Sequence, residues 1–194
     1  MRSKHLSLLA SVAVTALASA AFAGTSPQQI SKQDQQFLDR AWNVNTTEIR
    51  LGDVAEHKGT NADVKAFGQR MVADHTKLNK ELTTLAKQYD AVLPKALNTH
   101  HQQLVDKLSK MSGSDFDKEY MTDMIGGHEK AVAAFQKESQ DHAQTAVDKW
   151  AGQALPTLKD HLQLAEKTGK EVGASMPSQS TAIPAAHQEH PSGK

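Results

Sequence analysis

The sequence predicts an all-α protein, an antiparallel four-helix bundle with one extra short helix. Three observations lead to this fold class. Long stretches place apolar residues at steps of three and four, which is the spacing of an amphipathic helix. Glycines, prolines and helix-capping residues separate these stretches. The composition, with 5% aromatic residues and many Ala, Leu, Gln and Lys residues, is also typical of a helical bundle.

Residues 1–23 are predicted to be a signal peptide and are excluded from the fold. A basic start precedes a short apolar segment at 6–20, and residues 21–23 match an A-x-A cleavage site. The apolar segment is too short for a membrane-spanning anchor. We therefore expect a mature protein that begins near Gly24, carries no transmembrane anchor and resides in the periplasm, with association with the outer membrane left open.

Charge and cysteine usage exclude several classes of function. The whole chain has 22 basic and 22 acidic residues. Removing Arg2 and Lys4 with the signal peptide leaves a net charge of about −2. This balance argues against nucleic-acid binding, which needs a basic face. The absence of cysteine excludes disulfides, thiolate metal sites and cysteine nucleophiles. The mature chain must then be stabilised by core packing, and we expect one domain, residues 24–173.

The first two helices are predicted from their caps and inner faces. Ser31 caps the first helix, which runs to about residue 58 and ends at Gly59 as at a C′ glycine. Its inner face consists of Phe37, Ala41, Val44, Glu48, Leu51 and Ala55. Thr60 or Asn61 caps the second helix, residues 62–89. Its inner face consists of Val64, Phe67, Met71, His75, Leu78, Leu82 and Leu85.

A shorter helix follows. Pro94 ends any continuous helix, and Asn98 is expected to cap residues 100–111. The third long helix, residues 115–140, contains Gly126-Gly127, a pair that allows close helix approach or a kink. Its inner face consists of Phe116, Tyr120, Met124, His128, Ala131 and Phe135.

The fourth long helix is predicted over residues 146–173, with Thr145 as its cap and Pro156 inside it. Its inner face consists of Val147, Ala151, Ala154, Leu158, His161 and Ala165. Residues 174–194 are Ser, Pro, Ala, Gln and His without periodicity, which predicts a disordered tail.

Each inner face contains one polar residue: Glu48, His75, His128 and His161. We assumed that the long helices alternate strictly up and down, so that the Gly59 turn and the turn at 141–145 lie at the same end. At 1.5 Å per residue the four side chains then lie about 17, 20, 20 and 24 Å from that end, in one layer.

Three imidazoles and a carboxylate in one layer predict a metal site. Zinc accepts such ligands in four-coordinate geometry, and copper and iron also accept imidazole. The alternative is a metal-free polar layer in which Glu48 accepts hydrogen bonds from the histidines.

The chain also resembles a family of exported bacterial proteins named domain of unknown function 4142. The resemblance rests on Glu48-Ile49, Leu51-Gly52 and Ala55, then Val64-Lys65-x-Phe67 and Met71-Val72-x-Asp74-His75, then Phe116-Asp117-x-x-Tyr120 and His128, and last Leu155-Pro156-x-Leu158-x-x-His161. It covers about residues 34–165. The resemblance implies export and a ferritin-like bundle, and it supplies no established activity.

A ferritin-like di-iron centre needs Glu-x-x-His pairs, and the sequence has neither Glu-x-x-His nor Asp-x-x-His. Asp74 and Asp160 precede two of the histidines and point about 100° away from them, which makes them solvated or supporting residues.

The leading hypothesis is a non-enzymatic exported protein with an envelope or stress-related role that binds zinc, copper or iron. The second is a structural or interaction module, such as an envelope chaperone, whose partner is an unknown envelope protein. The third is a redox enzyme with a non-standard metal centre.

Overall fold

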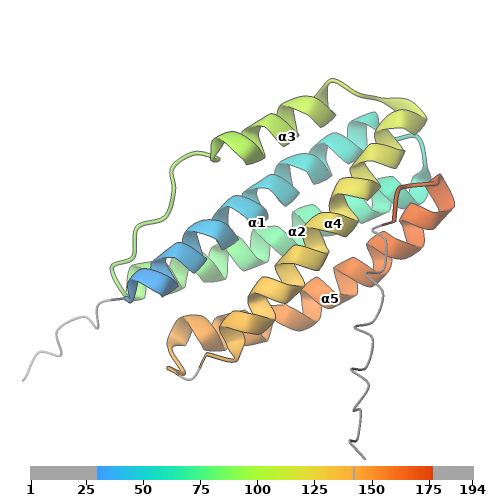
Figure 1. Ribbon diagram of the computed structural model, residues 1–194. Helices are drawn as coiled ribbons and strands as arrows, with labels where there is room; N and C mark the ends of the chain where they lie inside the picture. Colours follow the sequence, from blue (N-terminus) through green and yellow to red (C-terminus); the bar gives the residue numbers. More distant parts are fainter. Residues whose placement is uncertain (1–29, 142, 177–194) are drawn as a thin grey trace, which may run out of the picture.

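The computed structural model describes residues 30–141 and 143–176, so the predicted signal peptide and most of the predicted tail lie outside the described residues. This part of the chain forms helices and no strands, which confirms the all-α prediction (Figure 1). The helices are α1 (Lys32–Lys58), α2 (Ala62–Gln88), α3 (Thr99–Ser109), α4 (Gly113–Ser139) and α5 (Ala146–Val172). None of them has the length and apolar character that a membrane span requires.

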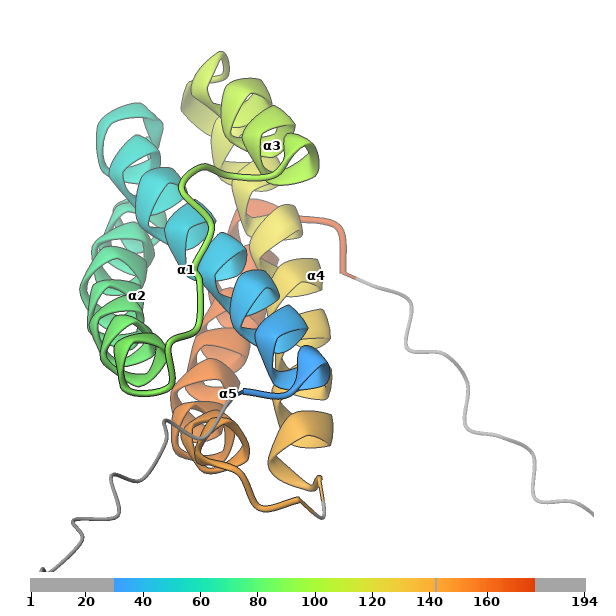
Figure 2. The same cartoon turned by 90° about the vertical axis from the view of Figure 1, so that its left-hand side faces the viewer.

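The four long helices form two antiparallel hairpins, α1–α2 and α4–α5, which pack side by side (Figure 1). The short helix α3 packs against the outside of α1 and reaches α4, as Figure 2 shows from the side. The turn between α1 and α2 meets the start of α4, because the backbone N–H groups of Thr60 and Asn61 donate to the Asp117 carboxylate. At the other end, Gln33 at the start of α1 donates to Asp141 after α4.

The long helices therefore run up, down, down and up, and the strict alternation assumed from the sequence is wrong. The segment that contains α3 carries the chain back along the bundle, so α4 starts at the end where α2 starts. A single long crossover of this kind is the connection found in ferritin-like bundles. The polar layer survives this reversal, because each of its members lies near the middle of a 27-residue helix.

Most of the predicted caps are confirmed. The side chains of Ser31, Asn61, Asn98 and Thr145 each accept a backbone N–H of the helix that they precede. Thr145 forms a full capping box with Asp148.

The helix boundaries agree with the predicted ones to within about two residues, and the details at Gly59 and at the start of α4 differ. Gly59 has φ −65° and ψ 153°, so it is not a left-handed C′ glycine. A Cβ there would lie 2.7 Å from the Ala55 carbonyl oxygen and 3.0 Å from Asp117 Oδ1, so the position needs glycine for space. Helix α4 begins at Gly113, two residues before the predicted start. Asp117 lies in the first part of α4, but its carboxylate accepts hydrogen bonds from the backbone just before α2.

The polar layer divides the hydrophobic core into two clusters. One cluster fills the end near the α1–α2 turn and includes Phe67, Met124 and Ala165. The other fills the end near the α4–α5 turn and includes Phe37 and Phe135. In each long helix, the polar residue of the layer separates the residues that belong to one cluster from those that belong to the other.

The close contact between α1 and α2 depends on a glycine pair that the sequence analysis did not single out. A Cβ on Gly52 would lie 2.5 Å from the Gly68 carbonyl oxygen, and a Cβ on Gly68 would lie 2.8 Å from that of Gly52. Gly126 and Gly127 do not have this role. A Cβ on Gly126 would meet nothing within 4 Å, and one on Gly127 would meet only Glu48 Oε1 at 3.9 Å.

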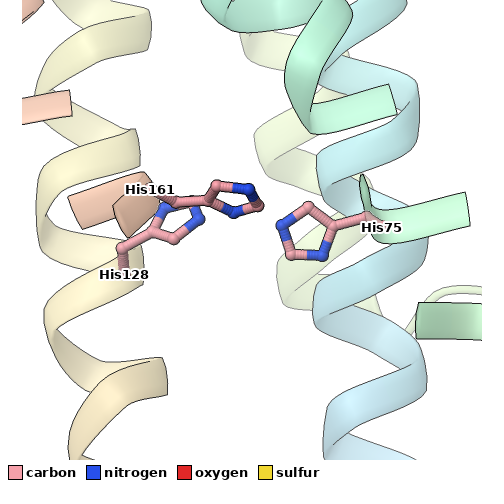
Figure 3. A group of neighbouring side chains, drawn as sticks. All are labelled: His75, His128 and His161. Atoms are coloured by element: carbon pink, nitrogen blue, oxygen red, sulfur yellow. The ribbon is translucent and has the colours of Figure 1, made fainter. Parts of the chain in front are cut away.

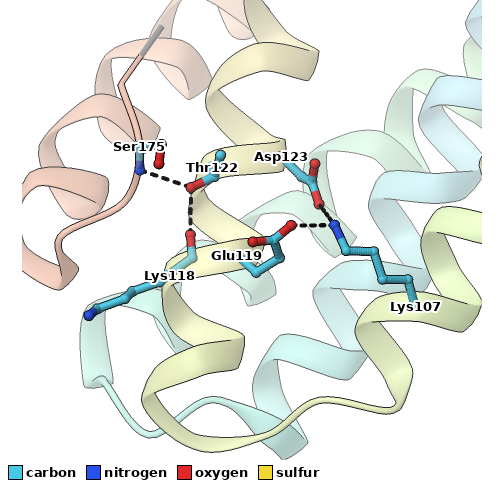
Figure 4. A network of polar contacts seen from close by, with 6 residues as sticks. All are labelled: Lys107, Lys118, Glu119, Thr122, Asp123 and Ser175. Atoms are coloured by element: carbon cyan, nitrogen blue, oxygen red, sulfur yellow. Dashed lines mark hydrogen bonds and ion pairs between the residues drawn. The ribbon is translucent and has the colours of Figure 1, made fainter.

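Helix α3 is tied to α4 by charged side chains (Figure 4). Lys107 on α3 forms ion pairs with Glu119 and Asp123, one turn apart on α4. On the neighbouring face of α4, Thr122 Oγ1 accepts the backbone N–H of Ser175, which holds the first residues after α5 against the bundle. The ion pairs of Lys107 keep α3 over the side of the bundle where Glu48 lies.

Candidate metal centre

Three histidines from three helices meet at the centre of the bundle (Figure 3). His75 comes from α2, His128 from α4 and His161 from α5, and their ring centroids are 5.2 to 5.8 Å apart. Their exposed fractions are 0%, 1% and 0%. One ring nitrogen of each lies within 4.8 Å of one ring nitrogen of the other two. The predicted convergence of these three side chains is therefore present in the fold.

Each imidazole is held by a hydrogen bond from one ring nitrogen. Nδ1 of His75 contacts Asn45 Oδ1 at 2.9 Å, and Nδ1 of His128 contacts the Met124 carbonyl oxygen at 2.9 Å. Nε2 of His161 contacts Asp74 Oδ2 at 2.8 Å. All three partners are oxygen acceptors, so the contacting nitrogen must carry the proton and donate. The second nitrogen of each neutral ring then has a free lone pair.

These second nitrogens are buried and have no hydrogen-bond partner within the described residues: His75 Nε2, His128 Nε2 and His161 Nδ1. Burying a polar atom without a partner costs free energy, and buried polar groups are therefore almost always paired. Three unpaired acceptors in one layer, each on a ring whose other nitrogen is fixed, are the arrangement in which histidines bind a metal ion.

The electrostatics keep the three rings neutral. Burial lowers the pKa of His75 well below its usual value, and His128 and His161 lower it further. Burial and the neighbouring His161 lower the pKa of His128 to about 4. Burial also lowers the pKa of His161, although its hydrogen bond to Asp74 works in the opposite direction. Neutral imidazole is the protonation state that a metal ligand requires.

Among the described residues, Asp74 is the carboxylate that forms a hydrogen bond with one of the three histidines. Partial burial raises its pKa, but the hydrogen bonds from His161 and Arg70 outweigh burial, and the net shift is downward. Asp74 therefore stays ionised and increases the basicity of the His161 ring. The sequence analysis weighed a supporting role for Asp74 and Asp160; the structure places Asp74 in that role and leaves Asp160 exposed.

The geometry suits a small ion with nitrogen ligands. Zinc–imidazole bonds of about 2.0–2.1 Å in tetrahedral geometry place ligand nitrogens roughly 3.3 Å apart. Nitrogens at the 4.8 Å limit would reach such an ion with a shift of less than about 1 Å for each ring. Three histidines leave a fourth coordination position, which Zn²⁺ and Cu²⁺ both fill with water or another ligand.

Glu48, the fourth residue of the predicted layer, does not belong to the group whose ligand atoms lie within 4.8 Å of one another. It is 5% exposed, and its Oε2 is buried without a partner. Burial, with a smaller effect of Asp123, raises its pKa to about 8, so the carboxyl is mainly neutral at pH 7.

Glu48 faces a separate space. It lines a cavity of about 550 Å³ between α1, α4 and the start of α3, whose lining also includes Gly126, Gly127 and Asp123. None of the three clustered histidines lines this cavity. The Gly126-Gly127 pair leaves the wall of the cavity open next to the Glu48 carboxyl.

Sequence reasoning missed Asn45 as a partner of His75. The periodicity of α1 predicts a single inner face, but α1 packs against α2, α3 and α4. Polar residues on several of its sides are therefore buried, including Asn43, Asn45 and Thr47. The available signal was the run of short polar residues around Glu48, which is unusual for a helix with only one buried stripe.

Comparison with protein families finds one match over most of the chain. The family model described as Domain of unknown function (DUF4142) matches residues 19–168. Comparisons with curated proteins and with solved structures find no match. The matched range contains α1 to α4, most of α5 and the three clustered histidines.

Proposed function

Because the chain belongs to the DUF4142 family, whose description names no activity, we propose a function from the site itself: the protein binds a divalent transition-metal ion through His75, His128 and His161. Zinc and copper are the leading candidates, with iron next, because all three accept neutral imidazole. The proposed role is metal binding in an exported protein of the cell envelope.

One observation carries this proposal. Each of the three rings donates from one nitrogen to a fixed oxygen and keeps the other nitrogen buried and unpaired. In the competing interpretation, a metal-free polar layer, Glu48 accepts hydrogen bonds from the histidines. No described hydrogen bond joins Glu48 to a histidine, and the second ring nitrogens have no partner among the described residues. The metal interpretation explains the unpaired atoms, and the polar-layer interpretation leaves them unexplained.

The burial of the site favours binding over turnover. All three rings are at most 1% exposed, so a substrate has no direct contact with them in this conformation. The site also joins the two hairpins, since His75 belongs to one and His128 and His161 to the other. Both features support a tightly held ion that stabilises the bundle.

The test is elemental analysis of the untagged protein, purified without chelators, followed by titration of the EDTA-treated protein with Zn²⁺, Cu²⁺ and Fe²⁺. We expect about one ion per chain in the wild type. His75→Ala, His128→Ala and His161→Ala should each reduce affinity by at least about tenfold. His100→Ala, which removes an exposed histidine of α3, is the matched control and should bind like the wild type.

Two results would reject the proposal. The first is a wild-type protein that carries no metal and takes up none of the three ions on titration. The second is binding that survives all three substitutions, which would place the metal elsewhere. In either case the metal-free structural module would become the better interpretation.

Export is a separate part of the proposal, supported by the basic start, apolar segment and A-x-A site of residues 1–23. It predicts that protein recovered from the periplasm begins near Gly24, which mass spectrometry of the intact chain would show. A full-length chain found only in the cytoplasm would reject export and leave the metal proposal unaffected.

A further inference from the structure

A second cluster of ligand-type side chains lies near the α4–α5 turn, away from the histidines. Asp34 in α1, Glu138 in α4 and Asp148 in α5 place one carboxylate oxygen each within 4.8 Å of the other two. The three residues are 6%, 5% and 3% exposed. Three acidic groups are thus gathered in a buried position where three helices meet.

Local structure explains two of these carboxylates and not the third. Asp34 lies in the first turn of α1, and Asp148 completes the capping box of α5, so both stabilise helix N-termini. Glu138 lies in the last turn of α4, where the helix dipole disfavours a negative charge. Its Oε1 is buried without a hydrogen-bond partner, and Asp148 Oδ1 is in the same condition.

No described cation neutralises the cluster. None of the ion pairs among residues 30–141 and 143–176 includes Asp34, Glu138 or Asp148. Arg40 acts on Glu138 only at longer range, while Asp141 adds a further negative charge. Burial, followed by the charges of Asp34 and Asp148, raises the pKa of Glu138 to about 7.

A shared proton does not account for the cluster either. Two carboxyls that share a proton lie within hydrogen-bond distance, and no described hydrogen bond links any two of these three residues. Within residues 30–141 and 143–176, Glu138 Oε1 and Asp148 Oδ1 therefore remain without a partner.

The oxygen ligands and their spacing are compatible with Ca²⁺. Calcium binds oxygen ligands at 2.3–2.6 Å, so three oxygens evenly spaced around one ion are at most about 4.0–4.5 Å apart. Three oxygens at the 4.8 Å limit would lie about 2.8 Å from a shared ion, so a shift of a few tenths of an ångström brings them to Ca²⁺ bond lengths. Mg²⁺ requires shorter bonds of about 2.0–2.1 Å and a more regular shell. A cavity of about 350 Å³ that is lined by Asp34, but not by Glu138 or Asp148, lies on one side of the cluster.

We propose that Asp34, Glu138 and Asp148 form a binding site for one Ca²⁺ ion that joins α1, α4 and α5 near the α4–α5 turn. The site is chemically distinct from the histidine cluster, because it offers only hard oxygen ligands. It does not depend on the metal function proposed for the histidines. The ion replaces the missing positive charge and connects the start of one hairpin to the turn of the other.

The experiment uses the whole untagged protein after EDTA treatment and removal of the chelator. Isothermal titration with CaCl₂ should show one site per chain, and Ca²⁺ should raise the melting temperature. Glu138→Gln keeps the shape of the side chain and removes its charge. We expect this variant to bind Ca²⁺ at least about tenfold more weakly and, without Ca²⁺, to melt at a higher temperature than the metal-free wild type.

Two controls separate this site from other effects. Glu171→Gln removes an exposed carboxylate of α5 and should leave Ca²⁺ binding unchanged. The triple substitution of His75, His128 and His161 by Ala should also retain Ca²⁺ binding, so the two proposals succeed or fail separately. Terbium, which replaces Ca²⁺, provides a second readout on the wild type alone: its luminescence, excited through tryptophan, should appear on binding and be displaced by Ca²⁺.

Several outcomes would overturn the proposal. The first is a wild type that shows neither a heat of Ca²⁺ binding nor a Ca²⁺-dependent melting temperature. The second is a Glu138→Gln variant that binds Ca²⁺ as tightly as the wild type does. The third is terbium luminescence that Ca²⁺ does not displace. If Glu138→Gln does not fold, Asp34→Asn takes its place in the titration. The terbium measurement on the wild type still tests whether a Ca²⁺ site is present.

Discussion

Asp74 on α2 accepts a hydrogen bond from Nε2 of His161 on α5 at 2.8 Å, across the interface between the two hairpins. This contact fixes the orientation of the His161 ring and leaves its Nδ1 directed away from the carboxylate. It also places a negative charge beside a cluster of three neutral rings. Asp74 therefore connects a partly exposed ion pair with Arg70 to the buried centre.

We expect Asp74→Asn to lower metal affinity by about 10–100-fold, because a supporting carboxylate orients its histidine and raises the basicity of the ring. Asp160→Asn is the matched control, since Asp160 directly precedes His161 in the sequence but is exposed. Competition with a chromophoric chelator would measure both affinities. Equal affinities in the two variants would show that the Asp74–His161 contact does not support metal binding.

The metal-free protein should lose stability in acid through its buried histidines. The pKa of His128 is about 4 in the folded protein, compared with an ordinary value of 6.5. Between these values the unfolded chain binds more protons, so this contribution is present above pH 6.5 and is lost as the pH falls toward 4. For His128 alone the loss is about 3 kcal/mol.

Urea unfolding of the EDTA-treated protein between pH 4 and pH 7 would measure this effect. His128→Gln should show a shallower pH dependence than the wild type over that range, because the substituted side chain does not titrate. Parallel curves for the two proteins would contradict the assignment of a neutral, buried His128.

Glu48 should produce the opposite trend at higher pH. Its folded-state pKa is raised to about 8 from an ordinary 4.5, so the folded protein binds the proton more tightly than the unfolded chain. This contribution is fully present below pH 4.5 and is lost as the pH rises from 4.5 to 8, by up to about 5 kcal/mol.

Glu48→Gln removes the ionisation and keeps the size of the side chain. We expect the variant to be more stable than the wild type at pH 8–9, and the difference to shrink as the pH is lowered toward 5. Denaturant unfolding at these pH values is the measurement. A variant that is less stable than the wild type at pH 9 would show that ionised Glu48 has a favourable partner in the folded protein.

The glycines of the bundle should respond to alanine in opposite directions. Gly52→Ala would place a Cβ 2.5 Å from the Gly68 carbonyl oxygen, so α1 and α2 must separate, and we expect a loss of about 1–3 kcal/mol. Gly126→Ala meets no atom within 4 Å and should stabilise the protein by about 1 kcal/mol through helix propensity. Thermal unfolding of both variants tests the pair. Similar changes in the two would contradict the packing described for α1 and α2.

Most of the fold could be predicted from the sequence because periodicity and capping are local signals. The spacing of apolar residues by three and four positions correctly predicted that His75, His128 and His161 lie in the core. The capping residues predicted the helix starts to within about two residues. The direction of α4 was missed because it depends on how far the α3 segment travels, and no short motif encodes that distance.

The site was only partly predictable for a related reason. The three histidines lie on inner faces, so depth along the helix was sufficient to bring them together. Glu48 shares their depth but points toward the cavity beside α4, because depth does not determine rotation about the helix axis. Asn45 and Glu138 were missed since their burial comes from packing on more than one side and from the meeting of helix ends, which a single-stripe description omits.

The division of the hydrophobic core into two clusters has a consequence for motion. The apolar contacts on either side of the histidine layer are not continuous, so each end of the bundle can open without disturbing the packing of the other. An ion held by His75, His128 and His161 would couple the two ends, since it connects both hairpins where the apolar contact is interrupted. Amide hydrogen exchange would then slow at both ends together when the metal is added, and the protein would behave as one cooperative unit and not as two.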